Sequence, residues 1–289
     1  MLRWITVAFT AFLSGCTNAA MDAVNALVPS GSYRLDAGLP YGSDPRQILD
    51  VYRPKADGQG VRPVVLFFYG GSWKFGSRTQ YKFLGEAFAS HGIVTVIADY
   101  RVYPAVKFPA FVNDGAHALQ WVRTHIEAYG GNGRGIYLMG HSAGAHIAAL
   151  VALDPSYAAA AGAENAVHGF IGLAGPYAFH PEQTENVRDV FLGTGDLERA
   201  RPINYARGGK DLAVFLAHGR ADTTVLPANT EQLTSQINAY GGSARAVFYD
   251  DIGHIGIMAA FARPFRKRAP VLNDVVKFIQ ETQAFQASQ

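Results

Sequence analysis

The pentapeptide at residues 140–144, Gly-His-Ser-Ala-Gly, carries the strongest chemical signal in the sequence. The pattern Gly-x-Ser-x-Gly is typical of a sharp turn between a strand and a helix, which raises a serine hydroxyl above the end of a sheet. The context agrees, because an apolar run at 136–139 precedes the turn and a helix-like run at 143–153 follows it. The glycines fit a strained backbone with no room for side chains. A chance glycine-rich turn is the competing interpretation, and we predict that Ser142 is a nucleophile.

A serine hydroxyl is a weak nucleophile at neutral pH, so it needs a histidine base and an acid that orients the histidine. In folds built around this turn, the order along the chain is serine, acid, histidine. His254 directly follows the last strand-like run and has a glycine on either side of it within two residues, which predicts a loop at the end of that strand. We predict that His254 is the base. His146, one helical turn after the serine, and His218 are predicted to be structural.

The predicted acid is Asp222. It follows the strand-like run at 213–217, lies in a turn-forming stretch and precedes His254, as the chain order requires. Asp250 and Asp251 stay as alternatives, although both are too close in sequence to His254 to lie at the end of a separate strand.

The negative charge that develops on a substrate carbonyl oxygen needs backbone N–H donors aimed at it, and one is expected from Ala143, the residue after the nucleophile. A second loop must supply the other. The stretch 69–73, Tyr-Gly-Gly-Ser-Trp, follows the strand-like run at 63–68 and offers the N–H groups of Gly71 and Ser72. We predict an oxyanion hole from these donors, with a plain tight turn as the alternative.

Aromatic residues near the predicted strand ends are candidates for substrate contacts. Trp73 and Phe75 follow the glycine pair, and Tyr177 follows the strand-like run at 169–173. We predict that Trp73 and Tyr177 contact the acyl or alcohol part of a substrate, with a place in the core as an equal alternative. No metal-ligand spacing and no phosphate-binding loop occurs in the sequence, so no metal and no cofactor are expected.

Short β-branched runs alternate with longer stretches of helical periodicity, which is typical of βαβ units around a mostly parallel sheet with helices on both faces. The segment 180–209 breaks this rhythm with mixed charge and two prolines, and we expect a small cap excursion with a helix near 185–191. The sequence therefore predicts an α/β fold of about eight strands. The candidate strands are 47–51, 63–68, 94–98, 136–139, 169–173, 213–217 and 244–249, and the candidate helices are 80–90, 111–129, 143–153, 230–240 and 271–285.

Composition restricts both the architecture and the partners. The chain has 289 residues, of which 49% are hydrophobic and 17% charged, and no linker-like stretch divides it, so we expect one compact domain. A formal net charge of +2 gives no support for nucleic acid as a partner and favours a neutral or weakly charged small molecule. A basic cluster at Arg263 and 266–268 is predicted to be a solvated face, with anionic lipid as the alternative contact.

The N-terminus has the pattern of a targeting segment. Arg3 precedes an apolar run at 4–13, and the sequence Leu-Ser-Gly-Cys at 13–16 resembles the lipobox of bacterial lipoproteins. We therefore predict a signal peptide at 1–15, a lipidated Cys16 with a tether at 16–31, and a folded domain at 32–289. Cys16 is the only cysteine. The expected location is the bacterial cell envelope, anchored to a membrane and facing the periplasm or exterior, or otherwise secretion after cleavage near 17–20.

Together these motifs resemble the carboxylesterase branch of the α/β-hydrolase family, which includes hormone-sensitive-lipase-like and feruloyl-esterase-like enzymes. The resemblance covers nearly all of the chain after the N-terminal segment, and it implies that Asp99, Arg101 and Asp114 support the fold. One position departs from the family pattern, because Tyr69 stands where the oxyanion loop usually begins with histidine. The matching positions are 49–52, 69–73, 99–101, 108–109, Asp114, 140–144 and 219–227.

The resemblance implies a serine carboxylesterase that hydrolyses short-chain or aryl esters through an acyl-enzyme on Ser142. The sequence has no long hydrophobic lid, which argues against a triglyceride lipase. Two other functions stay open at this point. The first is an arylformamidase-like amide hydrolase with the same triad, and the second, from a different class, is a lipid-anchored binding protein without turnover. The oligomeric state is not predicted.

Overall fold

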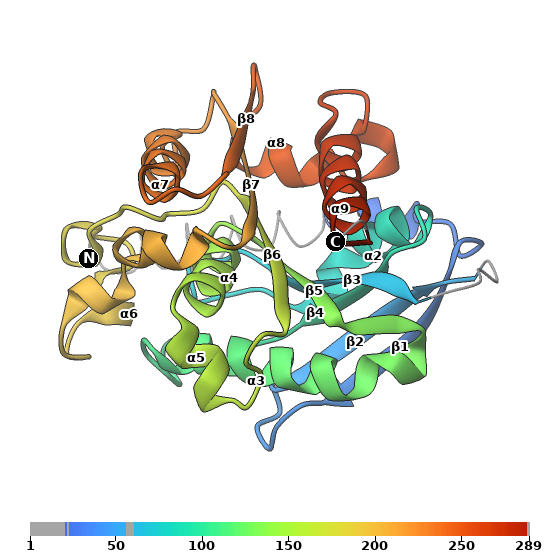
Figure 1. Cartoon of the computed structure of the whole chain (residues 1–289), viewed down its shortest axis with the longest axis horizontal. Coiled ribbons are helices and arrows are strands. Elements are labelled where there is room, and N and C mark those ends of the chain that lie inside the picture. Colours follow the sequence, from blue (N-terminus) through green and yellow to red (C-terminus); the bar gives the residue numbers. More distant parts are fainter. Residues whose placement is uncertain (1–20, 22, 56–60, 288–289) are drawn as a thin grey trace, which may run out of the picture.

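The computed structural model describes residues 21, 23–55 and 61–287, which contain one eight-stranded sheet in the order β1-β2-β4-β3-β5-β6-β7-β8 (Figure 1). From β4 to β8 all neighbouring strands are parallel, whereas β2 runs antiparallel to both β1 and β4. The predicted α/β fold is confirmed. The strands are β1 (Tyr33–Pro40), β2 (Ile48–Pro54), β3 (Arg62–Phe68), β4 (Val94–Ala98), β5 (Gly131–His141), β6 (Val167–Leu173), β7 (Ala213–Gly219) and β8 (Arg245–Tyr249).

Helices cover both faces of the sheet, with α2 and α9 on one face and α3, α4 and α7 on the other (Figure 1). The five predicted helices are all present, and the short α5 and α8 were not predicted. The α-helices are α2 (Lys82–Ala89), α3 (Ala110–His125), α4 (Ala143–Leu153), α5 (Pro155–Ala160), α6 (Arg188–Phe191), α7 (Ala228–Ala239), α8 (His254–Ala259) and α9 (Val271–Ala287). The 3-10 turns are η1 (Arg78–Tyr81), η2 (Ile126–Tyr129), η3 (Pro181–Gln183), η4 (Leu197–Ala200), η5 (Pro202–Gly209) and η6 (Arg263–Phe265).

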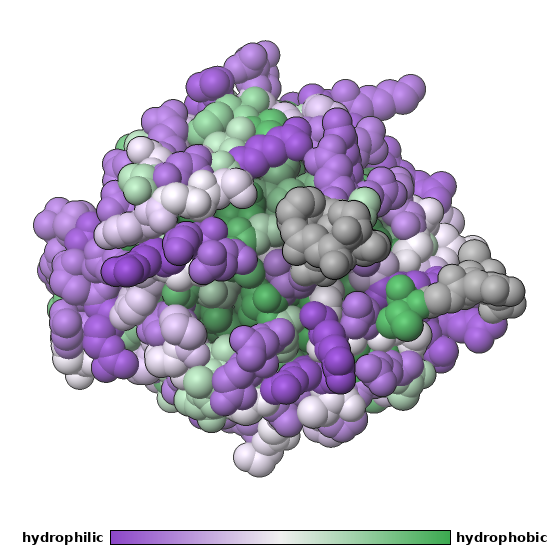
Figure 2. Space-filling model, viewed as in Figure 1, coloured by the Kyte–Doolittle hydropathy of each residue, from purple (hydrophilic) through white to green (hydrophobic). Residues whose placement is uncertain are grey.

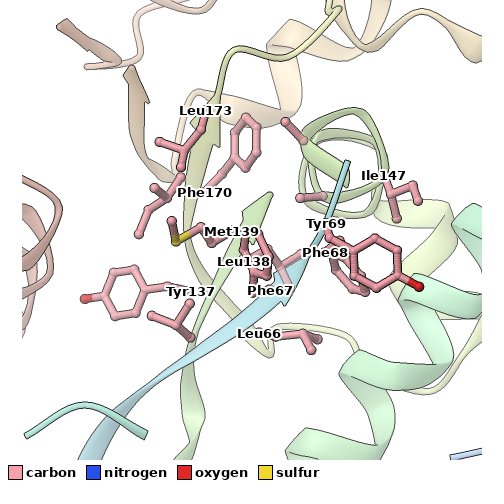
Figure 3. Close-up of a cluster of buried hydrophobic side chains, with 14 of the residues drawn as sticks. Leu66, Phe67, Phe68, Tyr69, Tyr137, Leu138, Met139, Ile147, Phe170 and Leu173 are labelled. Atoms are coloured by element: carbon pink, nitrogen blue, oxygen red, sulfur yellow. The ribbon is translucent and has the colours of Figure 1, made fainter. Parts of the chain in front are cut away.

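The core lies on both sides of the central strands β3, β5 and β6. Their residues are buried almost without interruption, as expected for parallel strands that helices cover on both faces. Figure 3 shows side chains of β3, β5 and β6 in one cluster, with Ile147 of α4 at its margin near Phe68. This packing fixes the positions at which the central strands end.

The carboxyl ends of the parallel strands share one edge of the sheet, so the loops after β3, β5, β6, β7 and β8 meet there. Every residue predicted to do chemistry lies at or just beyond one of these ends. The topology therefore brings together positions that are more than a hundred residues apart in sequence.

The segment 180–209 after β6 contains the short helix α6 and three 3-10 turns, and no strand is found among these residues, all of which are described. The predicted helix near 185–191 is confirmed in its second half. The segment packs back onto the domain, because Val190 and Phe191 are buried and the Phe108 N–H donates to the Val190 carbonyl at 3.1 Å. Lys74 Nζ also donates to the Asn186 carbonyl at 2.6 Å.

Part of the predicted tether is packed against the domain. The Asn25 side chain donates to the Thr79 carbonyl at 3.1 Å and accepts from the Phe83 N–H at 3.2 Å, and Met21, Val24 and Val28 pack on the core. The predicted signal peptide and Cys16 lie outside the described residues. Within the described ranges, none of the helices combines the length and the hydrophobicity that a membrane crossing requires.

The predicted basic cluster divides into two halves. Arg263 and Arg266 bind the buried carboxylate of Glu86 on α2, with N–O distances of 2.6 and 2.8 Å. Lys267 and Arg268 remain exposed. Arg263, in η6, and Arg266, directly after η6, therefore connect this region to α2.

Candidate active site

Ser142 lies between β5 and α4 with φ 55° and ψ −122°, a conformation that non-glycine residues rarely adopt. The glycines at 140 and 144 explain how the turn fits. A Cβ atom on Gly140 would lie 2.2 Å from the Gly144 carbonyl oxygen, and one on Gly144 would lie 2.0 Å from the Phe68 carbonyl oxygen. The nucleophile turn is thus held against β3 by close backbone packing.

The structure brings the predicted base and acid to Ser142. His254 Nε2 lies 2.9 Å from Ser142 Oγ, and His254 Nδ1 lies 2.7 Å from Asp222 Oδ2. Because an ionised carboxylate only accepts, Nδ1 carries the proton and Nε2 is left to accept the serine hydroxyl proton. One expectation was wrong in detail, since His254 is the first residue of α8 rather than part of a loop.

Asp222 is held by several donors at once. Its Oδ1 accepts from the N–H groups of Thr224 and Val225 at 2.8 and 2.9 Å, and its side chain is inaccessible to solvent. Burial by itself would raise the pKa of Asp222, but hydrogen bonds from His218, His254 and the Val225 N–H outweigh it and hold this pKa well below its ordinary value. Asp222 is therefore a carboxylate at neutral pH.

The two alternative acids lie elsewhere. Asp250 is exposed and pairs with Arg220 at 3.2 Å, and Asp251 is exposed with φ 56°. The His254 ring binds Asp222 rather than either of them. The geometry favours Asp222 as the acid.

The predicted oxyanion loop passes directly beside the nucleophile. A Cβ atom on Gly70 would lie 3.0 Å from Ser142 Cβ, so only glycine fits there without displacement. The turn is tight, with the Lys74 and Phe75 N–H groups donating to the Gly71 carbonyl at 2.9 and 3.0 Å and with Ser72 at φ 54°. Ala143 begins α4, whose first N–H groups have no partner within the helix. The backbone of both predicted segments therefore borders Ser142.

Tyr69, the residue that differs from the family pattern, is held at the start of this loop by its own contacts. Its ring stacks between Tyr81 and Tyr100, with centroids 5.6 and 4.9 Å away. Its hydroxyl donates to Asp99 at 2.7 Å and accepts from Arg46 at 2.9 Å. The tyrosine thus holds the base of the oxyanion loop through groups that lie away from Ser142.

The two predicted substrate contacts have different surroundings. Tyr177 is fully buried against Phe170 and Gly175, so it is a core residue, and the prediction that it touches substrate is not supported. Trp73 is 3% exposed and packs against α3, α4 and the segment 180–209. The members of this aromatic cluster are Trp73, Phe108, Phe111, His146, Phe179 and Phe191. Phe179 and Phe191 could not be found from sequence, because the path of 180–209 decides their position.

Two further histidines adjoin the site, and sequence reasoning assigned a catalytic role to neither. His141 Nε2 lies 2.9 Å from the His254 carbonyl oxygen, and the two imidazole centroids are 4.7 Å apart. Burial is the main cause that lowers the pKa of His141 to about 3, so its ring is neutral. His218 approaches Asp222 from β7 at 3.2 Å. His218, predicted to be structural, therefore also contacts the acid of the triad.

Segments that follow the carboxyl ends of β3, β7 and β8 carry exposed apolar side chains. Phe75 follows β3, Leu226 follows β7 and Ile255 follows β8, and each is more than half exposed. Figure 2 shows hydrophobic residues gathered near the centre of the viewed face and hydrophilic residues along its outline. No group of three or more metal-binding side chains occurs in the part of the chain that the structure describes.

Comparisons with known proteins show which proteins this chain is similar to. The BD-FAE family model matches residues 49–237. Isoprenylcysteine alpha-carbonyl methylesterase ICME of Arabidopsis thaliana is 30% identical over 77% of this chain and 57% of its own length. Esterase LipC of Mycobacterium tuberculosis is 36% identical over 76% of this chain and 57% of its own length. The chain therefore spans little more than half the length of these relatives.

Solved structures show the same fold at low sequence identity. An inhibited esterase B from Lactobacillus rhamnosis superimposes with a TM-score of 0.82, 18% identity and 98% coverage of both chains. A propionate-bound esterase Est2 from Thermogutta terrifontis gives a TM-score of 0.71 at 24% identity, covering 87% of this chain and 94% of that one. Both likenesses concern the fold.

Proposed function

The chain belongs to the BD-FAE family within the α/β-hydrolase carboxylesterases, and from this premise we propose that it is a serine carboxylesterase with Ser142, His254 and Asp222 as its triad. The observation that carries the proposal is the continuous line of hydrogen bonds from Ser142 Oγ through both nitrogens of His254 to Asp222, at 2.9 and 2.7 Å. A line of this kind activates a serine for acyl transfer, and in α/β-hydrolases it lies at the carboxyl edge of the sheet.

The reaction proceeds in two halves. Ser142 Oγ attacks the ester carbonyl carbon while His254 Nε2 takes the hydroxyl proton, and the resulting oxyanion accepts hydrogen bonds from the Ala143, Gly71 and Ser72 N–H groups. His254 then gives its proton to the departing alkoxide, and the acyl group stays on Ser142. Water attacks the acyl-enzyme by the same route and releases the acid. Asp222 stays ionised throughout and stabilises the His254 imidazolium.

The substrate that we propose is a neutral ester with a short or aromatic acyl or alcohol group. Two exposed apolar residues support an apolar substrate portion: Phe75, which follows the predicted oxyanion loop, and Ile255, which follows the base His254. Trp73, which is 3% exposed and directly follows Gly71 and Ser72, stays a candidate for contact with the substrate. The names of the relatives describe esterases, which favours an ester over an amide substrate.

A panel of p-nitrophenyl esters from acetate to palmitate, assayed on the chain that begins after Cys16, tests the activity. We expect turnover to fall as the acyl chain lengthens. Ser142→Ala should fold normally and lose essentially all turnover, because no other group on this line has a hydroxyl. A purified Ser142→Ala protein with turnover close to that of the unchanged chain would refute the assignment.

We also propose that Cys16 is lipidated and holds the enzyme in the bacterial cell envelope. The support is the sequence Leu-Ser-Gly-Cys at 13–16 after an apolar run, together with the lack of any other cysteine. Acyl chains on Cys16 would anchor the domain to a membrane surface without a spanning helix.

A further inference from the structure

His218 is the last but one residue of β7 and is fully buried. Its Nε2 lies 2.8 Å from the Val225 carbonyl oxygen and 3.2 Å from Asp222 Oδ2. Its Nδ1 lies 2.8 Å from the hydroxyl oxygen of Thr230 on α7, which is also fully buried. Both ring nitrogens are therefore engaged.

These neighbours decide which nitrogen of His218 carries the proton. The Val225 carbonyl oxygen and the ionised Asp222 carboxylate can only accept, so Nε2 must be the donor. Nδ1 of the neutral ring then accepts the Thr230 hydroxyl proton. The Val225 carbonyl and Asp222 thus set the tautomer of His218, and the Thr230 hydroxyl stabilises it by donating to Nδ1.

The N–H of His218 adds to the donors that already face Asp222. Oδ2 accepts from His254 Nδ1 at 2.7 Å, and Oδ1 accepts from the Thr224 and Val225 N–H groups. By holding the Val225 carbonyl, His218 also fixes the loop whose N–H groups bind Oδ1. A single imidazole therefore acts on the carboxylate both directly and through the loop.

We propose that His218 is a positioning residue for the reaction, in a tautomer that the Thr230 hydroxyl stabilises. Its N–H to Asp222 weakens the attraction of that carboxylate for the proton on His254 Nδ1. The inference rests on the proposed esterase function, since it assigns a role within the same triad. His218 touches neither the substrate nor Ser142.

The remaining titratable group packed against this pair is His141 on β5, which faces His254. Its buried ring stays neutral above a pKa of about 3 and does not titrate where His254 would be studied. Asp250 and Arg220 pair with each other at the surface, with more than half of each side chain exposed. A change in the titration of His254 can thus be traced to His218 and Asp222.

The decisive measurement is the titration of His254 by NMR in protein with ¹³C-labelled histidine. It is carried out in the Ser142→Ala background, so that the readout does not depend on turnover. His218→Leu removes a donor from Asp222, so we expect the apparent pKa of His254 to rise by about half a unit or more. His218→Gln keeps an N–H near the position of Nε2 and should restore most of the original value.

Thr230→Val tests the same idea without removing the imidazole. The valine has nearly the shape of threonine but no hydroxyl, so it should shift the titration in the same direction, and Thr230→Ser should restore it. Thr234→Val is the matched control, because the Thr234 hydroxyl donates to the Thr230 backbone carbonyl at 2.7 Å and not to His218. We expect no shift from that variant.

In the active enzyme, the acid limb of the pH profile of kcat/KM should move to higher pH in His218→Leu and in Thr230→Val. Folded variants that leave the His254 titration unchanged would overturn the proposal, even if kcat falls. The opposite combination is equally distinct. A shifted titration in the Ser142→Ala background, with no ester hydrolysis by the chain that keeps Ser142, would support the His218 role and refute the proposed function.

Discussion

At the scale of single residues, His141 and His146 are buried imidazoles that each bind one backbone carbonyl oxygen. Nε2 of His141 binds the His254 carbonyl at 2.9 Å, and Nε2 of His146 binds the Ala200 carbonyl at 2.7 Å. Burial is the main cause that lowers the pKa of His141 to about 3 and that of His146 to about 4. Both rings are therefore neutral in the folded protein at every pH where an esterase would be assayed.

This neutrality predicts a loss of stability in mild acid. An unfolded histidine has a pKa of about 6.5. Below this pH the two histidines are protonated in the unfolded chain but stay neutral in the folded protein. The folded pKa lies below the unfolded one, so the stabilisation is complete above about pH 6.5 and is lost as the pH falls toward the folded values. At about pH 5 we expect each residue to cost roughly 2 kcal/mol of unfolding free energy.

Urea unfolding at pH 7.5 and pH 5 measures this loss. His146→Gln, whose side chain does not titrate, should lose less unfolding free energy over that interval than the unchanged chain. His117→Gln is the matched control, because His117 is exposed on α3. An equally steep loss in His146→Gln would show that other groups cause the acid sensitivity.

At the scale of elements, α2 is joined to the region of η6 by one carboxylate and two arginines. Glu86 is 1% exposed, while the Arg263 and Arg266 side chains are 53% and 24% exposed. Burial alone would raise the pKa of Glu86, but its hydrogen bonds and charge interactions with the two arginines lower it. Glu86 is thus a buried anion, and Arg263 and Arg266 compensate its charge.

Removing both arginines should be more damaging than removing the glutamate. Arg263→Ala combined with Arg266→Ala leaves a buried anion without these cationic partners and should lower the unfolding free energy by about 3 kcal/mol or more. Glu86→Gln leaves two arginines that water can reach, so its cost should be smaller. Denaturant unfolding of both variants tests the order, with Lys267→Ala combined with Arg268→Ala as the control. The reverse order would contradict this account.

Several elements could be predicted from sequence because their signal is local. The apolar runs of β3 to β7 and the periodicity of α3, α4 and α9 follow from residues near one another in the chain. β1 was missed because Tyr33–Pro40 is mostly exposed and interrupted by a register shift near Gly38, so only its pairing with β2 defines it. α5 was missed although Asp154 and Pro155 form a recognisable helix start.

The candidate site divides in the same way. Ser142, Asp222 and His254 could be chosen because each follows a predicted strand and the chain order is restrictive. The burial of Tyr177 and the contact between His218 and Asp222 could not, because both depend on how side chains meet across separate elements. Trp73 was predicted only as either a substrate contact or a core residue, because its neighbours include Phe191 of the segment 180–209 and the adjoining Phe179.

At the scale of the whole molecule, the proposed anchor and the domain are close together in sequence. The Asn25 side chain binds Thr79 and Phe83 beside α2. Met21 follows Cys16 by five positions, which span about 17 Å when the chain is fully extended. A lipid on Cys16 would therefore keep the domain near the membrane surface.

Fractionation of a bacterial host that expresses the full chain tests the anchor. The unchanged chain should be recovered with membranes, whereas Cys16→Ser should be recovered in the soluble or secreted fraction with its ester turnover intact, because residue 16 is remote in sequence from the triad. Thr17→Ser is the control and should stay with membranes. Recovery of the unchanged chain in the soluble fraction would favour an ordinary secretory peptide.

The hydrogen bond between His254 and Ser142 joins residues 112 positions apart, and His254 follows β8, which lies at the edge of the sheet. A nascent or translocating chain that has delivered Ser142 but not residue 254 has no base for its nucleophile. The proposed catalysis therefore requires the chain at least as far as residue 254. The rate at which ester turnover appears would then measure how fast this C-terminal part joins the rest of the protein.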